Sequence, residues 1–597
     1  MTLRAADRAL LVVAAVAVAI AAADTYVVVL ALPEMSAAAG IEAIDLQRAA
    51  PIISGFLLGY VAMLPLIGRV ADLEGRVPVL VLSLAVFAVG SGVTALAYDL
   101  PGMVAGRFLQ GVGGGGLVPA TMALVADLYP VHRRGLPLGL VSAVQELGSV
   151  LGPVLGAAVL AVATWRGIFA LNLAAGVVLL LATQRLARRS AMADARTAAG
   201  DAAPVAAGPA PPRRHLDAVS VMLALLVAVA GALTALQPSG LVRHVVWGEL
   251  FAPYVGESRW LAPVGLLAVL GLVALLAWSL LAPAPLLDLR RWGRALVAAD
   301  LPGALLLAVA LGGVILAFGT GDPEIQVFSD QGHWYLLGSA IALGWLVVHL
   351  RRSARPLVPR GALAARGAWG GLLVSLFVGA ALIAAVVALP IFARTTVYPD
   401  SQLLASLVLV RLLAALPVGA VLGGLLLRHV PAGVVAGAGM AAAAVGFVVM
   451  ARWDASALEG WGANVPLLLT GLGFGLALAP VNAVVLASTD DTVHGLASAM
   501  VVVARMVGML VGISALTTLG LRAFYAERDA LPAIDEVCGR VGTCDAYKDL
   551  LRDAALTQEQ VVFAGAAVCA AIAALLALAL FRGADTRGAQ RPGLLVG

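Results

Sequence analysis

The chain has 597 residues, 62% of them hydrophobic, and a formal net charge of +4 at pH 7. Its mean hydropathy is +1.00, and its apolar content exceeds the roughly 45–50% of soluble domains, which excludes an ordinary soluble protein. The basic residues are scattered over short stretches between apolar runs, a pattern typical of membrane topology signals and not of nucleic-acid binding. The sequence therefore predicts a polytopic membrane protein.

Apolar runs of about 20 residues, long enough to cross a hydrocarbon layer about 30 Å thick, recur along the chain. They predict about sixteen transmembrane helices, near residues 9–32, 49–67, 78–97, 102–128, 136–163, 167–184, 216–237, 260–282, 295–318, 333–350, 369–392, 402–427, 432–451, 463–488, 495–520 and 559–581. The first run lacks a convincing small-residue cleavage site and is interpreted as a retained helix. Arginine is enriched in alternate short loops, which predicts a plasma-membrane protein with both termini in the cytoplasm.

The domain organisation follows from a change in composition at 187–215, where Ala, Pro and charged residues predict a flexible cytoplasmic linker. This linker separates an N-terminal six-helix half, 1–186, from about four inserted helices, 216–352, and a C-terminal six-helix half, 369–585. The last half includes a long outer segment, 522–558, which contains Cys538 and Cys544. In an oxidising compartment these two cysteines are expected to form a disulfide, and the alternative is two free thiols.

Asp24 lies within the first apolar run, past the midpoint of its helix. An ionised carboxylate at this depth is strongly disfavoured unless it is hydrated or paired. We therefore expect Asp24 to be a proton carrier whose charge differs between the inward-open and outward-open states. The alternative is a static hydrogen-bonded polar contact.

The stretch GRVADLEGR, 68–76, resembles the loop signature of the major facilitator superfamily through Gly68, Asp72, Gly75 and Arg76. A tight turn of this kind can place a carboxylate against a helix N-terminus or an arginine of the other half, forming a breakable latch. The alternative is a solvated turn, and the usual additional basic residues of the signature are missing here.

Arg107 and Gln110 match the fourth-helix pattern of the same superfamily. An intramembrane arginine is costly unless it faces a polar cavity or a partner, and the alternative is that Arg107 snorkels to the interface. A formal G-x-G-x-x-G at Gly111, Gly113 and Gly116 lies inside the same apolar run, so it does not indicate a dinucleotide site. No cofactor is expected.

The fifth predicted helix resembles the superfamily's antiporter motif, G-x-x-x-G-P-x-x-G, at Gly148, Gly152, Pro153 and Gly156. Such a pattern produces a pliable, closely packed helix, and the alternative is ordinary small-residue packing.

Glu146 precedes this motif by two residues, and Arg505 lies deep in the penultimate helix. Each charge is expensive alone, so the sequence predicts that the two pair across the halves in one conformation and separate in another. The alternative is that each charge pairs within its own half.

Together these features resemble a drug:proton antiporter of the major facilitator superfamily, and more closely the actinobacterial triacylglycerol exporters that work beside a periplasmic lipid-binding lipoprotein of the LprG kind. The resemblance is carried by DTYVVV at 24–29, LLGYVAMLPLIGRVAD at 57–72, AVQELGSVLGP at 143–153 and ASAMVVVARMVGMLVGISAL at 497–516. It implies a proton-coupled lipid exporter with alternating access, Asp24 in proton coupling, and Glu146 with Arg505 as an ion lock. The chain departs from these relatives in its four central helices, where two are usual.

The predicted cavity lining of Ala, Val, Leu, Gly and Met fits a lipid or a hydrophobic drug better than a sugar. The main alternative function is therefore general multidrug efflux by proton antiport. A membrane enzyme is disfavoured because no loop offers a metal-ligand set, a nucleophile elbow or an acid/base pair facing one aqueous side. A nontransporting scaffold for a lipoprotein would not require the intramembrane charges.

Overall fold

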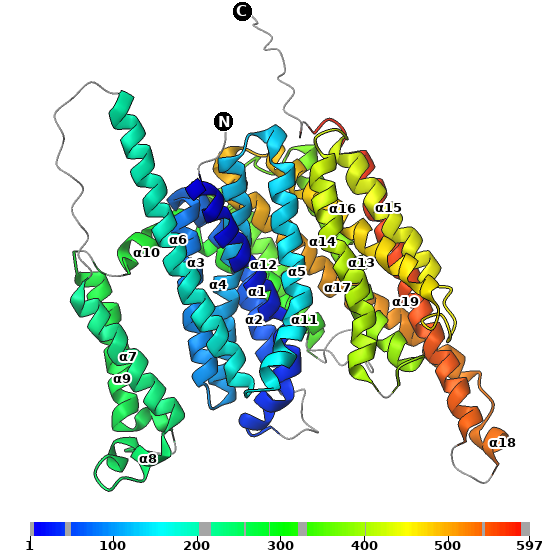
Figure 1. Ribbon diagram of the computed structural model, residues 1–597, viewed down its shortest axis with the longest axis horizontal. Helices are drawn as coiled ribbons and strands as arrows, with labels where there is room; N and C mark the ends of the chain where they lie inside the picture. The colour runs from blue at the N-terminus through cyan, green and yellow to red at the C-terminus, as the bar shows by residue number, and fades with distance from the viewer. Residues whose placement is uncertain are drawn as a thin grey trace, which may run out of the picture.

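The computed structural model describes residues 5–41, 49–201, 217–255, 258–283, 285, 287–319, 331–399, 401–539, 544–584 and 586. These residues form helices and connecting turns, with no strand among them (Figure 1). The expected all-α polytopic class is confirmed. Fourteen described helices are long and apolar enough to cross a membrane, and a bent pair, α10 with α11, makes up to fifteen.

The N-terminal helices form one bundle, drawn blue to cyan in Figure 1. They are α1 (Ala5–Ala38), α2 (Ala50–Glu74), α3 (Arg76–Leu96), α4 (Leu100–Leu128), the short 3₁₀ turn η2 (Val131–Arg133), α5 (Gly135–Leu160) and α6 (Trp165–Asp201). Asp99 caps α4 by accepting a hydrogen bond from the Gly102 amide. The prediction of a flexible linker at 187–215 is wrong for 187–201, which continue α6 as helix, whereas 202–215 lie outside the described residues.

The C-terminal helices form a second bundle beside the first, drawn yellow to red. They are α13 (Arg366–Thr395), α14 (Gln402–Leu426), α15 (Ala432–Met450), η5 (Trp461–Ala463), α16 (Asn464–Ala487), η6 (Asp491–Val493), α17 (His494–Asp529), α18 (Ile534–Cys538) and α19 (Asp545–Leu580). We call the end of the molecule with the 68–76 turn the motif end. The end with α18 is the disulfide end.

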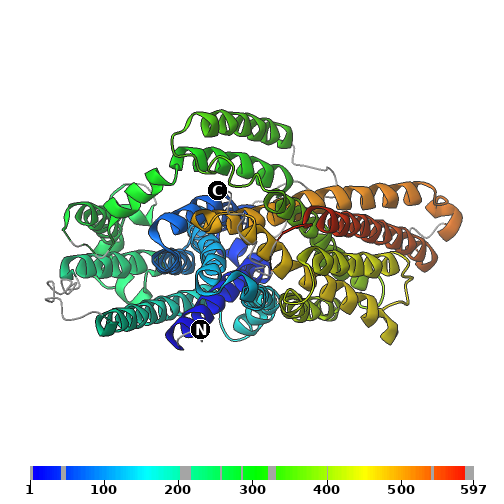
Figure 2. The same cartoon turned by 90° about the horizontal axis from the view of Figure 1, so that it is seen from above.

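The inserted helices flank this two-bundle core (Figure 2). They are α7 (Ala218–Leu236), α8 (Ser239–Val242), η3 (Gly248–Phe251), η4 (Arg259–Leu261), α9 (Pro263–Leu281), α10 (Leu289–Ala298), α11 (Leu301–Gly319) and α12 (Gly332–Arg352). The α11 helix packs against α2 and α17, and so contacts both bundles, whereas α12 packs on α11. The α7 and α9 helices form a separate hairpin next to α3.

Asp217 fixes the start of the α7–α9 hairpin. Its carboxylate accepts hydrogen bonds from the Ser220 hydroxyl and from the indole nitrogen of Trp278 on α9, both at 2.6 Å. The hydrogen bond from Ser220, and then that from Trp278, hold the pKa of Asp217 below its usual value. This carboxylate therefore both caps α7 and joins it to α9.

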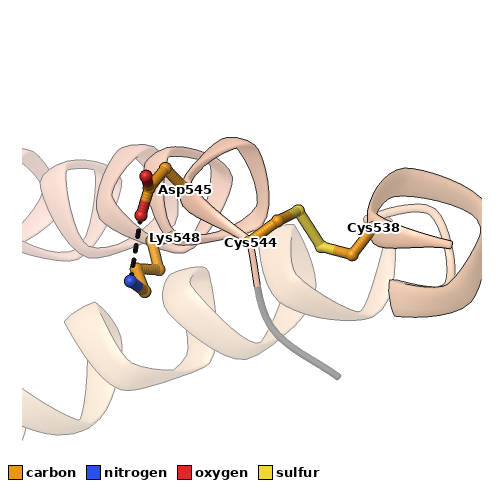
Figure 3. The surroundings of a disulfide bond; sticks show 4 residues. All are labelled: Cys538, Cys544, Asp545 and Lys548. Carbon is orange, nitrogen blue, oxygen red and sulfur yellow. Dashed lines mark hydrogen bonds and ion pairs between the residues drawn. A yellow bond between two sulfur atoms is a disulfide. The ribbon is translucent and has the colours of Figure 1, made fainter. Parts of the chain in front are cut away.

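Two helices reach beyond the bundle at the disulfide end. The α17 and α19 helices have 36 residues each, a length of about 54 Å, whereas a hydrocarbon layer needs only about 30 Å. Figure 1 shows both extending toward α18. A disulfide joins Cys538 to Cys544 at this tip, and Lys548 contacts Asp545 at 3.0 Å beside it (Figure 3).

Removing the disulfide with Cys538→Ser and Cys544→Ser is expected to loosen the tip and leave the bundle intact. The bridge closes a short loop, so its local contribution is about 2 kcal/mol. Limited trypsin digestion should cut several-fold faster near Lys548 in the variant, while the main thermal unfolding midpoint stays within about 2 °C of the wild type. A large drop in that midpoint would show that the tip supports the whole bundle.

Candidate functional site

A buried polar cluster lies in the N-terminal bundle around Asp24. Arg107 Nη1 donates to Asp24 Oδ2 at 2.5 Å, and the two residues have exposures of 0% and 1%. Asn172 Nδ2 on α6 donates to the other carboxylate oxygen, also at 2.5 Å. The carboxylate is therefore held from two different helices.

Gln110 and the rings of Phe56 and Phe169 complete the surroundings of Arg107. Gln110 Oε1 accepts from Arg107 Nη1 at 3.1 Å, while Gln110 Nε2 donates to Ser91 Oγ at 2.9 Å and contacts Asp24 Oδ1 at 3.5 Å. The Arg107 guanidinium lies 4.3 Å from the centre of the Phe56 ring, in cation–π geometry. The cluster thus supplies charge, hydrogen bonds and aromatic faces to a cation that is removed from solvent.

The sequence identified both charges but not their partnership. Arg107 does not snorkel to the interface, because it is fully buried and paired with Asp24. Asn172 was missed, since an asparagine early in a predicted apolar helix has no distinguishing pattern. Comparing how deep each residue lies in the membrane would have indicated the pair. Asp24 lies late in a helix that starts at the motif end, and Arg107 lies early in a helix that starts at the disulfide end, so the two are at a similar depth.

The antiporter-type motif on α5 packs directly against the helix that carries Asp24. A Cβ on Gly148 would meet the backbone of Ala19, and one on Gly152 would meet the backbone of Ala23. Gly156 is also buried, whereas the Pro153 side chain lies outside the described residues. The glycines therefore permit close contact of α5 with α1 next to Asp24.

A second charge pair joins the two bundles. Arg505 Nη1 on α17 lies 3.5 Å from Glu146 Oε1 on α5, and both residues have exposures of 8%. Arg505 also lines a small cavity between the bundles, together with Ser142, Gln145, Ser375 and Asn482 and with apolar residues such as Met122 and Val502. The arginine of the pair thus lies at the wall of a mixed polar and apolar cavity.

The 68–76 segment, which is the end of α2 with Gly75 and the first residue of α3, binds the start of α17. Asp72 accepts hydrogen bonds from the backbone amides of Gly495 at 2.8 Å and Leu496 at 3.0 Å. Such a carboxylate satisfies unpaired amides and interacts favourably with the helix dipole. Arg76 holds Asp72 at 2.9 Å and reaches Asp127 on α4 at 3.3 Å.

Glycines bring the bundles together at the motif end. Gly75 forms the turn with a φ of +94°, a value that L side chains rarely adopt. Gly68 packs on the Gly495 backbone, and Gly135 on α5 packs on Gly424 of α14. These contacts, with the Asp72 hydrogen bonds, close this end of the interface in the described conformation.

Comparison with known proteins identifies the family. The sequence profile of the Major Facilitator Superfamily matches residues 14–347. The chain belongs to the Major Facilitator Superfamily. A triacylglyceride transporter of Mycolicibacterium hassiacum is 33% identical over 85% of this chain and 78% of its own length. One from Mycolicibacterium smegmatis is 31% identical over 94% of this chain and 85% of its own.

A solved structure supports the fold alone. The crystal structure of the human organic anion transporter MFSD10 (TETRAN) aligns with a TM-score of 0.50 at 12% identity, covering 96% of this chain and 99% of that one. As a member of this superfamily, the protein is a multi-pass membrane transporter and not an enzyme.

Sequence reasoning also missed a buried acid, Glu559 on α19. Its exposure is 2%, and its Oε1 accepts a hydrogen bond from Gln558 Nε2 at 3.2 Å. The last predicted helix, 559–581, begins at this residue, so its place in the sequence gave no sign of burial. Because α19 begins 14 residues earlier, at Asp545, Glu559 instead lies well within the helix.

Removing Asp24 and removing Arg107 should reduce the stability of the protein by different amounts. Asp24→Asn leaves a buried arginine that cannot lose its charge, at a cost of about 3–5 kcal/mol. Arg107→Met leaves an aspartate that can bind a proton, so the loss of stability should be smaller. The double variant should be more stable than Asp24→Asn alone.

Thermal unfolding of the purified variants in one detergent measures these differences. Glu459→Gln, at an exposed acid, is the matched control and should unfold with the wild type. Equal midpoints for Asp24→Asn and Glu459→Gln would contradict a stabilising pair.

Proposed function

We propose that this transporter exports triacylglycerol-like lipids by proton-coupled alternating access. The observation that carries the proposal is the combination of two membrane-buried carboxylates, each opposite an arginine, with relatives named as triacylglyceride transporters over most of both chains. A buried acid that faces an arginine can carry a proton only if the pair changes, so proton binding and conformation become linked.

The proposed coupling has one role for each pair. Proton binding to Asp24 leaves Arg107 without its counter-ion, which favours movement of α1 relative to α4 and α6. Proton binding to Glu146 frees Arg505, and so weakens the contact between the bundles. Asp72 acts as the latch that holds α17 until those contacts are released.

The proposed location is the plasma membrane, with the motif end and both termini in the cytoplasm. The disulfide supports this orientation, because such bonds persist in oxidising compartments and the tip lies at the opposite end. A periplasmic lipid-binding lipoprotein would then meet the extended ends of α17 and α19. Their charged, exposed residues give a water-soluble surface beyond the bilayer.

General multidrug efflux remains the second candidate function, because the cavity also carries Gln145, Asn482 and two serines. Polar groups of this kind can orient a drug as well as an ester. Transfer of a cationic dye measured beside lipid transfer separates the two functions.

The deciding experiment measures transfer of labelled triacylglycerol out of proteoliposomes under an imposed pH gradient. The wild type should transfer lipid, and collapse of the gradient with a protonophore should reduce the rate at least about tenfold. Asp24→Asn should lose the gradient-driven component, whereas Asp24→Glu, which keeps a proton-binding group, should retain part of it.

No lipid transfer by folded wild type, with gradient-driven dye transfer, would favour the drug antiporter. Lipid transfer that ignores the gradient would contradict proton coupling but not the lipid substrate.

A further inference from the structure

The short helix α10 lies across the neighbouring spans. It is bent by 74° from α11, and Figure 1 shows it crosswise near the ends of α7 and α9. Ala295 is buried, and Trp292 and Leu296 pack against the core, whereas Arg290 and Arg294 are exposed. A helix with an apolar side and an arginine side, lying across the spans, has the form of a membrane-surface helix.

Two contacts hold α10 in this position. Arg291 Nε bonds to Glu74 Oε2, at the end of α2, at 2.7 Å. At the other end of α10, Asp300 has a φ of +67° and accepts hydrogen bonds from the Gly303 and Leu357 amides. Specific side-chain contacts at both ends of α10 therefore stabilise the bend between α10 and α11.

Asp300 also brings a second set of arginines to this place. Its carboxylate bonds to His349 Nε2 at 2.7 Å, which fixes the last turn of α12 beside the start of α11. Arg351, Arg352 and Arg355 follow directly and are exposed. Two helices thus present arginines at the same corner of the motif end.

The charge at this corner is not balanced by the acids that the structure describes. Among the described residues, the side chains of Arg290, Arg294, Arg351, Arg352 and Arg355 form no salt bridge. The acids next to α10 are engaged by other groups, since Glu74 pairs with Arg291, Asp288 caps α10, and Asp300 is buried against His349. A cluster of arginines without acidic partners at the membrane surface attracts anionic lipid headgroups strongly.

We propose that α10, the last turn of α12 and the residues directly after α12 form a binding surface for anionic phospholipid headgroups in the leaflet at the motif end. The surface consists of Arg290, Arg294, Arg351, Arg352 and Arg355. It is separate from the transport pathway, and the proposal stands whether the transported molecule is a lipid or a drug. A simple topology signal would need only positive charge at this end, without a bent helix that arranges it.

The test uses the full chain in phosphatidylcholine bilayers with trace spin-labelled phosphatidylglycerol or phosphatidylcholine. Electron paramagnetic resonance gives the immobilised fraction of each label, and so the preference for the anionic lipid. The wild type should prefer phosphatidylglycerol, less so at high salt. In the variant with Arg290, Arg294, Arg351 and Arg352 changed to Gln, the preference for phosphatidylglycerol should be at least about fivefold smaller than in the wild type.

The matched control removes the same charge from the same end, with Arg133, Arg185, Arg428 and Arg582 changed to Gln, all of them exposed. It should keep the wild-type preference, and lysine at the four surface positions should also keep it. Equal losses in both Gln variants, or no preference in the wild type, would overturn the proposal. Displacement of the label by millimolar glycerol phosphate would also overturn it, because the site would then take a soluble phosphate.

Discussion

A charged side chain in the membrane interior needs a partner, and Arg107 meets this requirement through Asp24. Arginine cannot escape by losing its proton, so the surrounding helices must be arranged around it. Three helices contribute directly: α1 supplies the carboxylate, α4 the guanidinium and Gln110, and α6 supplies Asn172. The close packing of α5 on α1 through Gly148 and Gly152 depends on the same placement of α1.

The second pair, Glu146 with Arg505, differs in position and in consequence. It connects the bundles instead of stabilising one of them. Its two side chains are 3.5 Å apart, and Arg505 lines a cavity between the bundles. In the proposed cycle, the Asp24 pair senses protons within one bundle, and the Glu146 pair transmits the change to the other. The Asp72 cap on α17 lies along the same interface. In the proposed cycle the three features therefore act on one movement.

Much of the fold was predictable because hydrophobic length is a strong signal for membrane helices, and the expected class is confirmed. Helix ends were less predictable where polar residues continue a helix beyond the lipid: α6 runs to Asp201, α17 to Asp529, and α19 starts at Asp545. The same limitation hid Glu559 within α19. The buried charges were predictable from their cost, but the Asp24–Arg107 partnership depends on the relative depth of distant helices. The hydrogen bond from Asn172 to Asp24 depends on how the side chains of α1 and α6 pack, which cannot be inferred from a single sequence.

In the proposed cycle, proton binding to the buried carboxylates releases the closed motif end. Pulsed electron resonance between spin labels at Leu73→Cys and His429→Cys, in a Cys569→Ala background, measures the separation of the bundles there. We expect a short distance at alkaline pH and a population with a longer distance at acid pH, whereas Glu146→Gln should show the longer distance at both pH values. A distance that is unchanged by pH, in a protein that still transports, would contradict the proposed cycle.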